Sequence, residues 1–161
     1  MATQSAGILL YRRKDGRRLL VLLVHPGGPF WRRKDLGAWS IPKGERVAGE
    51  DPAVTARREF AEELGSTPAG QLQHLGSIRQ RGGKQVEAFA LEGDFDPERV
   101  SSNTFEIEWP PRSGRRESFP EVDRAAWFSM ADARVKILDG QRPLLDRLEA
   151  LLAGDGEAVP R

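Results

Sequence analysis

The chain has 161 residues, a length that suits one domain with enough apolar side chains for a core. Its formal net charge is only +1, which argues against a general nucleic-acid or membrane-surface protein, because such proteins carry a strong basic excess. The sequence contains no cysteine and two histidines. Disulfides, thiolate catalysis and cysteine-based zinc sites are therefore excluded, and a histidine-rich metal site is not expected.

The N-terminal segment carries no targeting signal, because the apolar run from Gly7 to Tyr11 is too short for a signal peptide. No run approaches the roughly 20 apolar residues of a membrane span. We therefore expect a cytoplasmic protein, with neither a membrane nor nucleic acid as its partner.

A hairpin followed by a loop is predicted at the start of the chain. Residues Ser5 to Arg13 are expected to form a strand, and the near-continuous apolar run from Leu19 to His25 is typical of a strand buried on both faces. The turn between them contains Lys14-Asp15-Gly16. Pro26 to Leu36 is expected to be a loop, and Ala38 to Ile41 a short strand.

The loop contains the unusual segment Phe30-Trp31-Arg32-Arg33-Lys34, which has two interpretations. In the first, its aromatic pair is tucked under the loop as an ordinary packing contact. In the second, the segment is a flap that stacks on a base and screens phosphate charge. Both interpretations stay open at this point.

The segment from Gly44 to Gly65 predicts a loop and then a helix with well-marked ends. Asp51 is a good N-cap residue, Pro52 a good first helical residue, and Gly65 the expected C-terminal stop. Helical spacing gives an apolar stripe that would seat the helix on a core, formed by Ala53, Ala56, Phe60 and Leu64.

Next to the apolar stripe, the same spacing places Glu59, Glu62 and Glu63 on one face. Such a trio alone is typical of a solvated acidic surface. The glycines of the preceding loop, with Lys43 at its mouth, favour a different reading, since free backbone N–H groups and a lysine suit an anion. The glutamates could bind a hard cation, and the loop with Lys43 could bind a phosphate group beside it. Together they indicate chemistry on a phosphate chain.

The rest of the chain predicts further strands and helices. In chain order, these are strands over Gln71 to Gln80 and Lys84 to Leu91, a helical turn from Asp96, a strand over Ser102 to Trp109, a loop over Pro110 to Pro120, a strand over Ala125 to Phe128, a helix beginning at Ser129 and an amphipathic helix from Arg142 to Leu152. Strands on both sides of one central helix favour a mixed sheet between helices.

The spacing of Gly44, Glu50 and the run from Arg58 to Gly65 resembles the signature box of the Nudix hydrolases. Every charged and glycine position of that pattern is present, and the one departure is Ser66, where the family has an aliphatic residue. The resemblance implies an α/β fold, the Nudix-type α/β/α sandwich with a mixed β-sheet. We expect one such domain over residues 1–152, and a flexible tail over residues 153–161.

The resemblance also implies roles for individual residues. Glu59, Glu62 and Glu63 match the metal-binding glutamates of the box, and Arg58 matches the arginine that orients them. Gly44 matches the glycine whose backbone carbonyl can approach the metal. The matched roles are catalytic for Arg58, Glu59 and Glu62, and more structural for Glu50.

Many members of the family use a further glutamate outside the box, as a ligand or as the general base. It often precedes a tryptophan-bearing strand, and Glu121, six residues before Trp127, is the candidate here. Glu108 and Glu117 are rivals. Either Glu59 or Glu121 is expected to be the base.

The lead-in Trp39-x-x-Pro42-Lys43-Gly44 resembles members that act on nucleoside triphosphates and dinucleoside polyphosphates. We therefore expect hydrolysis of a phosphoanhydride bond in such a nucleotide, dependent on Mg²⁺, with Mn²⁺ as a substitute. Substrate contacts are expected from Lys43, Trp31, Arg112 and Arg116. The alternatives are an ADP-ribose or nucleotide-sugar pyrophosphatase, and a non-catalytic module that senses nucleotides.

Overall fold

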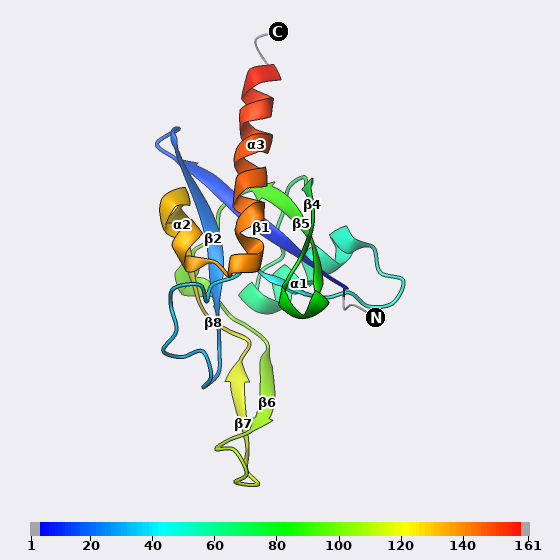
Figure 1. The fold of residues 1–161 in the computed structure, drawn as a ribbon, viewed down its shortest axis with the longest axis vertical. Coiled ribbons are helices and arrows are strands. Elements are labelled where there is room, and N and C mark those ends of the chain that lie inside the picture. Colours follow the sequence, from blue (N-terminus) through cyan, green and yellow to red (C-terminus); the bar gives the residue numbers. More distant parts are fainter. Residues whose placement is uncertain (1–3, 159–161) are drawn as a thin grey trace.

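The computed structural model describes residues 4–158, with Arg81 and residues 155–158 described by their backbone alone. Its centre is a mixed six-stranded sheet (Figure 1), in which five strands lie in the order β4-β5-β1-β2-β8. These strands are β1 (Gln4–Lys14), β2 (Arg18–Pro26), β4 (Gln73–Arg79), β5 (Gln85–Glu92) and β8 (Val122–Ser129). The sixth, β3 (Lys43–Glu45), pairs with β1. Among the described strands of this sheet, β1 and β5 pair parallel and the other neighbouring strands pair antiparallel.

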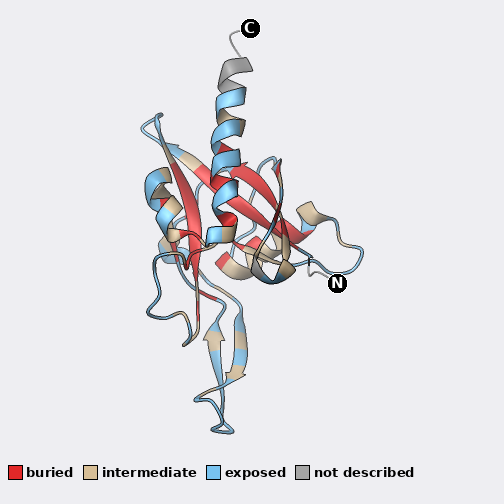
Figure 2. Ribbon diagram, viewed as in Figure 1, coloured by how far each residue is buried: buried red, intermediate tan, exposed pale blue. Residues whose placement is uncertain are grey.

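Helices cover both faces of this sheet, which confirms the expected α/β/α sandwich. On one face lies α1 (Pro52–Leu64), and on the other lie α2 (Met130–Lys136) and α3 (Arg142–Ala158). Because side chains alternate along a strand, Leu9 packs under α3 whereas Ile8 packs under α1. The sheet is buried along its centre (Figure 2).

The first hairpin and the ends of α1 agree with the sequence. β1 and β2 pair antiparallel. A side-chain oxygen of Asp51 accepts a hydrogen bond from the backbone N–H of Ala53 at 2.8 Å, as an N-cap residue should. Gly65 adopts a φ of 86°, and this left-handed conformation ends the helix.

The prediction of a strand over Ala38 to Ile41 is wrong in position, because the regular strand in this region is β3, at Lys43–Glu45. Ser40 only bridges Val24, and Trp39 only bridges Ile137. Pro42 has no N–H to donate to a ladder, so regular pairing begins after it, in β3. Gly44 therefore lies in a short strand beside β1, and not at the start of a loop.

The loop expected over Pro110 to Pro120 is also wrong in part. Its second half is the strand β7 (Arg116–Pro120), which pairs with β6 (Thr104–Glu108) in a separate two-stranded sheet. The hairpin projects from the body of the protein (Figure 1). Phe105 lies opposite Phe119 in this hairpin, and such an aromatic pair stabilises a short polar strand that the sequence pattern alone does not indicate.

Three short 3₁₀ helices complete the fold, at Arg81–Gly83, Pro97–Arg99 and Asp139–Gln141. The final helix, α3, continues to Ala158, beyond its expected end at Leu152. Of the expected tail over residues 153–161, the last three residues lie outside the described part of the chain. Within residues 4–158, no helix is long and apolar enough to cross a membrane.

Candidate active site

The site begins where α1 packs against β3. The Glu59 side chain reaches Gly44 so closely that a Cβ atom at this glycine would lie 1.9 Å from the Glu59 Oε1 atom. No side chain fits at position 44 unless the Glu59 carboxylate moves. The absence of a side chain at Gly44 is therefore what lets this carboxylate lie against the β3 backbone.

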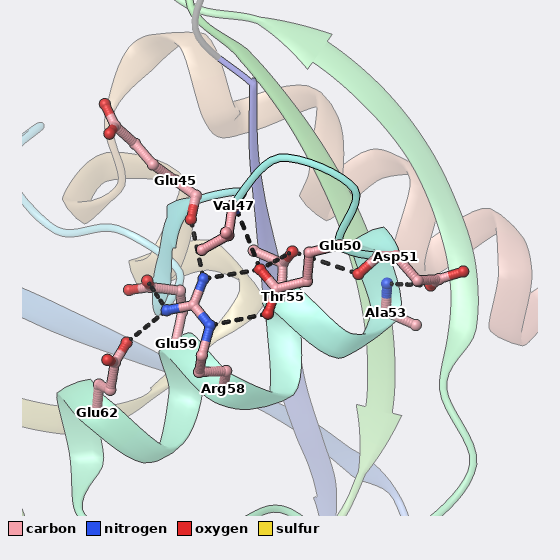
Figure 3. Close-up of polar contacts among 9 residues, drawn as sticks. All are labelled: Glu45, Val47, Glu50, Asp51, Ala53, Thr55, Arg58, Glu59 and Glu62. Atoms are coloured by element: carbon pink, nitrogen blue, oxygen red, sulfur yellow. Dashed lines mark hydrogen bonds and ion pairs between the residues drawn. The ribbon is translucent and has the colours of Figure 1, made fainter.

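Arg58 holds this arrangement together (Figure 3). Its Nε and Nη2 atoms both donate to the carboxylate of Glu50 at 2.9 Å, and Nη2 also donates to the Glu45 carbonyl oxygen at 3.0 Å. Its Nη1 atom donates to Glu59 at 2.7 Å and to Glu62 at 2.8 Å. Because a guanidinium has five N–H donors in a fixed plane, these five contacts determine how the three carboxylates lie.

Glu50 acts as the support for Arg58. One of its oxygens also accepts hydrogen bonds from the Thr55 hydroxyl at 2.8 Å and from the Val47 backbone N–H at 3.2 Å. The hydrogen bonds from Arg58, and next those from Thr55, lower the pKa of Glu50 to about 2. An acid that is ionised so firmly and enclosed by donors is a structural anion, in keeping with the role that the sequence resemblance implies.

The other glutamates show the opposite behaviour. Burial is the main cause that raises the pKa of Glu63 to about 8, and the charges of Glu59 and Glu121 add to it. The pKa of Glu59 is also raised, first by burial and then by the charge of Glu62. Burial and Glu62 together raise the pKa of Glu121. These four carboxylates therefore lie near enough to repel one another.

The carboxylates of Glu59, Glu62 and Glu63 are ligands of the type that a hard divalent cation prefers. All the donor atoms are carboxylate oxygens, and a cation would relieve the mutual repulsion that raises their pKa values. Glu59, Glu62 and Glu63 each keep one carboxylate oxygen that is free of hydrogen bonds to Arg58 or to the Lys43 backbone. Among the described residues, no three acidic or histidine side chains converge closely enough to hold a metal ion as they stand, so these side chains would have to rotate to bind a cation.

A pocket of about 190 Å³ opens beside these carboxylates, and Glu63, Glu121, Lys43 and Trp31 all line it. The backbone N–H of Lys43 donates to Glu63 Oε1 at 3.2 Å. Burial lowers the pKa of the Lys43 ammonium group. The structure thus brings together two expected substrate contacts and two expected acidic residues from four separate parts of the chain.

The other two expected substrate contacts lie elsewhere. Arg112 and Arg116 are exposed on the β6–β7 hairpin, where Arg116 pairs with Glu106 at 3.2 Å. Glu108 is at the same end, and its carboxylate accepts hydrogen bonds from the hairpin backbone. Of the three glutamates considered outside the box, only Glu121 lines the pocket, whereas contact of the two arginines with substrate stays a prediction.

The sequence reading missed Asn103, which places Glu121. The backbone N–H of Asn103 donates to the Glu62 carbonyl oxygen at 2.9 Å, and its carbonyl oxygen accepts from the Glu121 backbone N–H at 2.8 Å. The Glu121 carbonyl oxygen in turn accepts from the Gly27 N–H at 2.9 Å. These are all backbone contacts, so no side-chain signal in the sequence could have indicated them.

Comparison with known proteins agrees with this geometry. A family model described as the NUDIX domain matches residues 1–148. An RNA pyrophosphohydrolase of Rhodospirillum rubrum is 29% identical over 162 aligned positions, which cover 98% of this chain and 94% of that protein. An RNA pyrophosphohydrolase of Brucella abortus is 28% identical over 150 aligned positions, which cover 84% of this chain and 76% of that protein.

Solved structures show the same fold. The binary complex of a C. elegans Ap4A hydrolase has a TM-score of 0.66 and 25% identity, covering 93% of this chain and 98% of its own. The NUDIX domain of Shewanella oneidensis NrtR, complexed with ADP ribose, has a TM-score of 0.65 over 94% of this chain and 89% of its own. At 18% identity, the second likeness shows the fold alone.

The Glu50–Arg58 pair predicts an acid-dependent loss of stability. The folded-state pKa of Glu50 lies below its ordinary value of 4.5, so the stabilisation is present above pH 4.5 and is lost as the pH falls towards 2. At pH 7 we expect Glu50→Gln to unfold at lower denaturant concentration than the wild type, with the gap closing over that pH range. The exposed Glu98→Gln is the control, and a gap for Glu50→Gln that is independent of pH would contradict the prediction.

The close approach at Gly44 predicts a loss of activity without a loss of fold. In Gly44→Ala, the added methyl group must displace the Glu59 carboxylate. We expect kcat to fall by about 10²-fold, because a small misplacement of a catalytic group costs that much. The melting temperature should change little. Gly154→Ala, where a Cβ atom meets open space, is the matched control; equal kcat values in the two variants would refute the role of this contact.

Proposed function

The chain belongs to the Nudix hydrolase family, and from this premise we propose that it hydrolyses a phosphoanhydride bond in a nucleoside polyphosphate, with Mg²⁺ as its metal and Mn²⁺ as a substitute. The substrate is a nucleoside triphosphate or a dinucleoside polyphosphate. One observation carries the proposal: Lys43, Trp31, Glu63 and Glu121, from four separate parts of the chain, all line a single pocket.

The pocket suits the chemistry of a phosphate chain. The negative oxygens of a phosphate chain repel an attacking hydroxide. A catalyst must therefore neutralise this charge, position a water molecule and accept a proton from that water. A divalent cation held by Glu59, Glu62 and Glu63 would supply charge neutralisation and an acidified water. Lys43 adds positive charge at the pocket wall. The raised pKa values of Glu59 and Glu121 suit either of them to act as the general base.

The size of the pocket indicates where the nucleoside lies. Ordinary small-molecule sites have volumes of about 300–1,000 Å³. At about 190 Å³ the pocket is too small for a whole nucleotide, but a depression of about 690 Å³ shares Trp31 and Leu138 with it. We place the phosphates in the smaller pocket and the nucleoside in the depression, with Trp31 between them.

A second candidate substrate is the 5′ end of RNA. Two relatives named RNA pyrophosphohydrolases align with most of this chain. Three consecutive exposed cations, Arg32, Arg33 and Lys34, follow Trp31 and have no ion pair within the described residues. An oligonucleotide whose 5′ phosphates enter the pocket could pass along these cations. This candidate departs from the expectation, drawn from net charge, that nucleic acid is not a partner.

A substrate panel tests the proposal. The purified protein is incubated with Mg²⁺ and, separately, a nucleoside triphosphate, diadenosine tetraphosphate, ADP-ribose, a nucleotide sugar and a 5′-triphosphorylated RNA oligonucleotide, and the products are separated by chromatography. We expect cleavage of the free polyphosphates, and none in the presence of excess EDTA. Cleavage of RNA alone would establish the second candidate, and cleavage of ADP-ribose or sugars alone would refute both.

Replacing one carboxylate tests the role of the acidic cluster. Glu63→Gln keeps the size of the side chain and its contact with the Lys43 backbone, but removes a charge that a cation needs. We expect kcat to fall by at least about 10²-fold with the fold intact by circular dichroism. Glu98→Gln should keep the wild-type rate. A rate near that of the wild type in Glu63→Gln would rule out its role as a metal ligand.

A further inference from the structure

His25 is the one histidine in the sheet core, and its side chain is 0% exposed. It lies near the end of β2, outside the acidic site. Its Nδ1 atom is 2.9 Å from Asp123 Oδ1, and its Nε2 atom is 2.6 Å from the Lys34 carbonyl oxygen. Both ring nitrogens thus face an oxygen, and the role of this buried polar group is unexplained by the acidic site.

The Lys34 carbonyl oxygen determines the protonation of one ring nitrogen. A backbone carbonyl only accepts hydrogen bonds, so Nε2 must carry a proton. The Nε2–H group therefore donates to the Lys34 carbonyl oxygen while Nδ1 faces the Asp123 carboxyl group, so both ring nitrogens of this buried side chain have a polar partner.

The surroundings of His25 contain several charged groups. Asp123, with its side chain 31% exposed, also lies 3.6 Å from the Nε atom of Arg124. Arg124 stacks over the Trp39 ring, which meets the His25 ring edge-on at 5.2 Å. On the same side, Asp35 of the loop pairs with Lys136 of α2 and accepts a hydrogen bond from the Trp39 Nε1 atom at 2.8 Å.

This buried contact reaches the catalytic pocket in two steps. His25 binds the carbonyl oxygen of Lys34, and the backbone N–H of Lys34 donates to the Trp31 carbonyl oxygen at 2.9 Å. The Lys34 ammonium group also lies over the Trp31 ring, 5.0 Å from its centre. Trp31 lines both the catalytic pocket and the adjoining depression. The loop that carries Trp31 is exposed, so its conformation depends on such anchors.

We propose that His25 is a positioning residue for substrate binding: through its contacts with Asp123 and the Lys34 carbonyl oxygen, it fixes the turn over residues 31–34 and with it Trp31 in the pocket wall. The inference rests on the proposed function for its effect on substrate. It differs from a purely structural role, in which His25 fills space in the core and its loss lowers stability alone.

The protonation state is tested first, without any substrate. The chain has two histidines, and the other, His74, is 57% exposed on β4. In His74→Gln, the imidazole signals in a ¹⁵N NMR spectrum at neutral pH therefore belong to His25. We expect a proton on Nε2, the nitrogen that faces the Lys34 carbonyl oxygen. In the double variant with Asp123→Asn, whose amide can donate to Nδ1, we expect this proton alone. A ring without a proton on Nε2 would overturn the hydrogen bond from His25 to the Lys34 carbonyl oxygen.

The position of the turn is tested by amide hydrogen exchange and kinetics on His25→Phe, with His74→Phe as the matched control. We expect faster exchange of the Lys34 N–H in His25→Phe, with exchange in β1 unchanged. We expect KM to rise about tenfold and kcat to change much less, since the carboxylates keep their places. Unchanged KM and Lys34 exchange in folded His25→Phe would overturn the proposal.

Two further conditions keep the tests decisive. If His25→Phe does not fold, His25→Leu replaces it, because a leucine side chain has no N–H group to donate to either acceptor, and the same exchange and KM criteria apply. If the wild-type protein hydrolyses no nucleotide, the proposed function fails, whereas the NMR and exchange measurements still decide whether His25 bridges Asp123 and Lys34 and holds the turn.

Discussion

The site depends on the hydrogen bonds that the guanidinium group of Arg58 donates. This group joins the loop before α1, through Glu50 and the Glu45 carbonyl oxygen, to Glu59 and Glu62 on the helix itself. One cation cannot neutralise three carboxylates, and only Glu50 is held firmly ionised. Two further glutamates, Glu63 and Glu121, line the adjoining pocket, and a cluster of carboxylates of this kind would attract a divalent cation.

The sheet supplies what α1 lacks. Its strands carry Lys43 on β3 and place Glu121 directly before β8, so that both reach the pocket that Glu63 lines. Backbone hydrogen bonds through Asn103 tie Glu121 to the last turns of α1. The acidic helix, a lysine and a distant glutamate are thereby held at one place by elements that are rigid because their apolar faces are buried.

The features that the sequence predicted well are local ones. The ends of α1 depend on Asp51 and Gly65, which act within a few residues, and the burial of β2 follows from its apolar run. The missed features depend on distant contacts. The strand β7 needs its pairing with β6, and the bridge between His25 and Asp123 joins residues 98 positions apart. Periodicity cannot indicate such contacts, because both partners are ordinary for their own segments.

The central claim is that the carboxylates arranged by Arg58 form a divalent cation site next to the Lys43 pocket. Anomalous diffraction from crystals soaked in Mn²⁺ tests it most directly, because the signal locates the metal without any assumption about substrate. We predict an anomalous peak bounded by carboxylate oxygens of Glu59, Glu62 and Glu63, which is lost in crystals of Arg58→Gln. A peak at another place, or no peak at a saturating Mn²⁺ concentration, would contradict the claim.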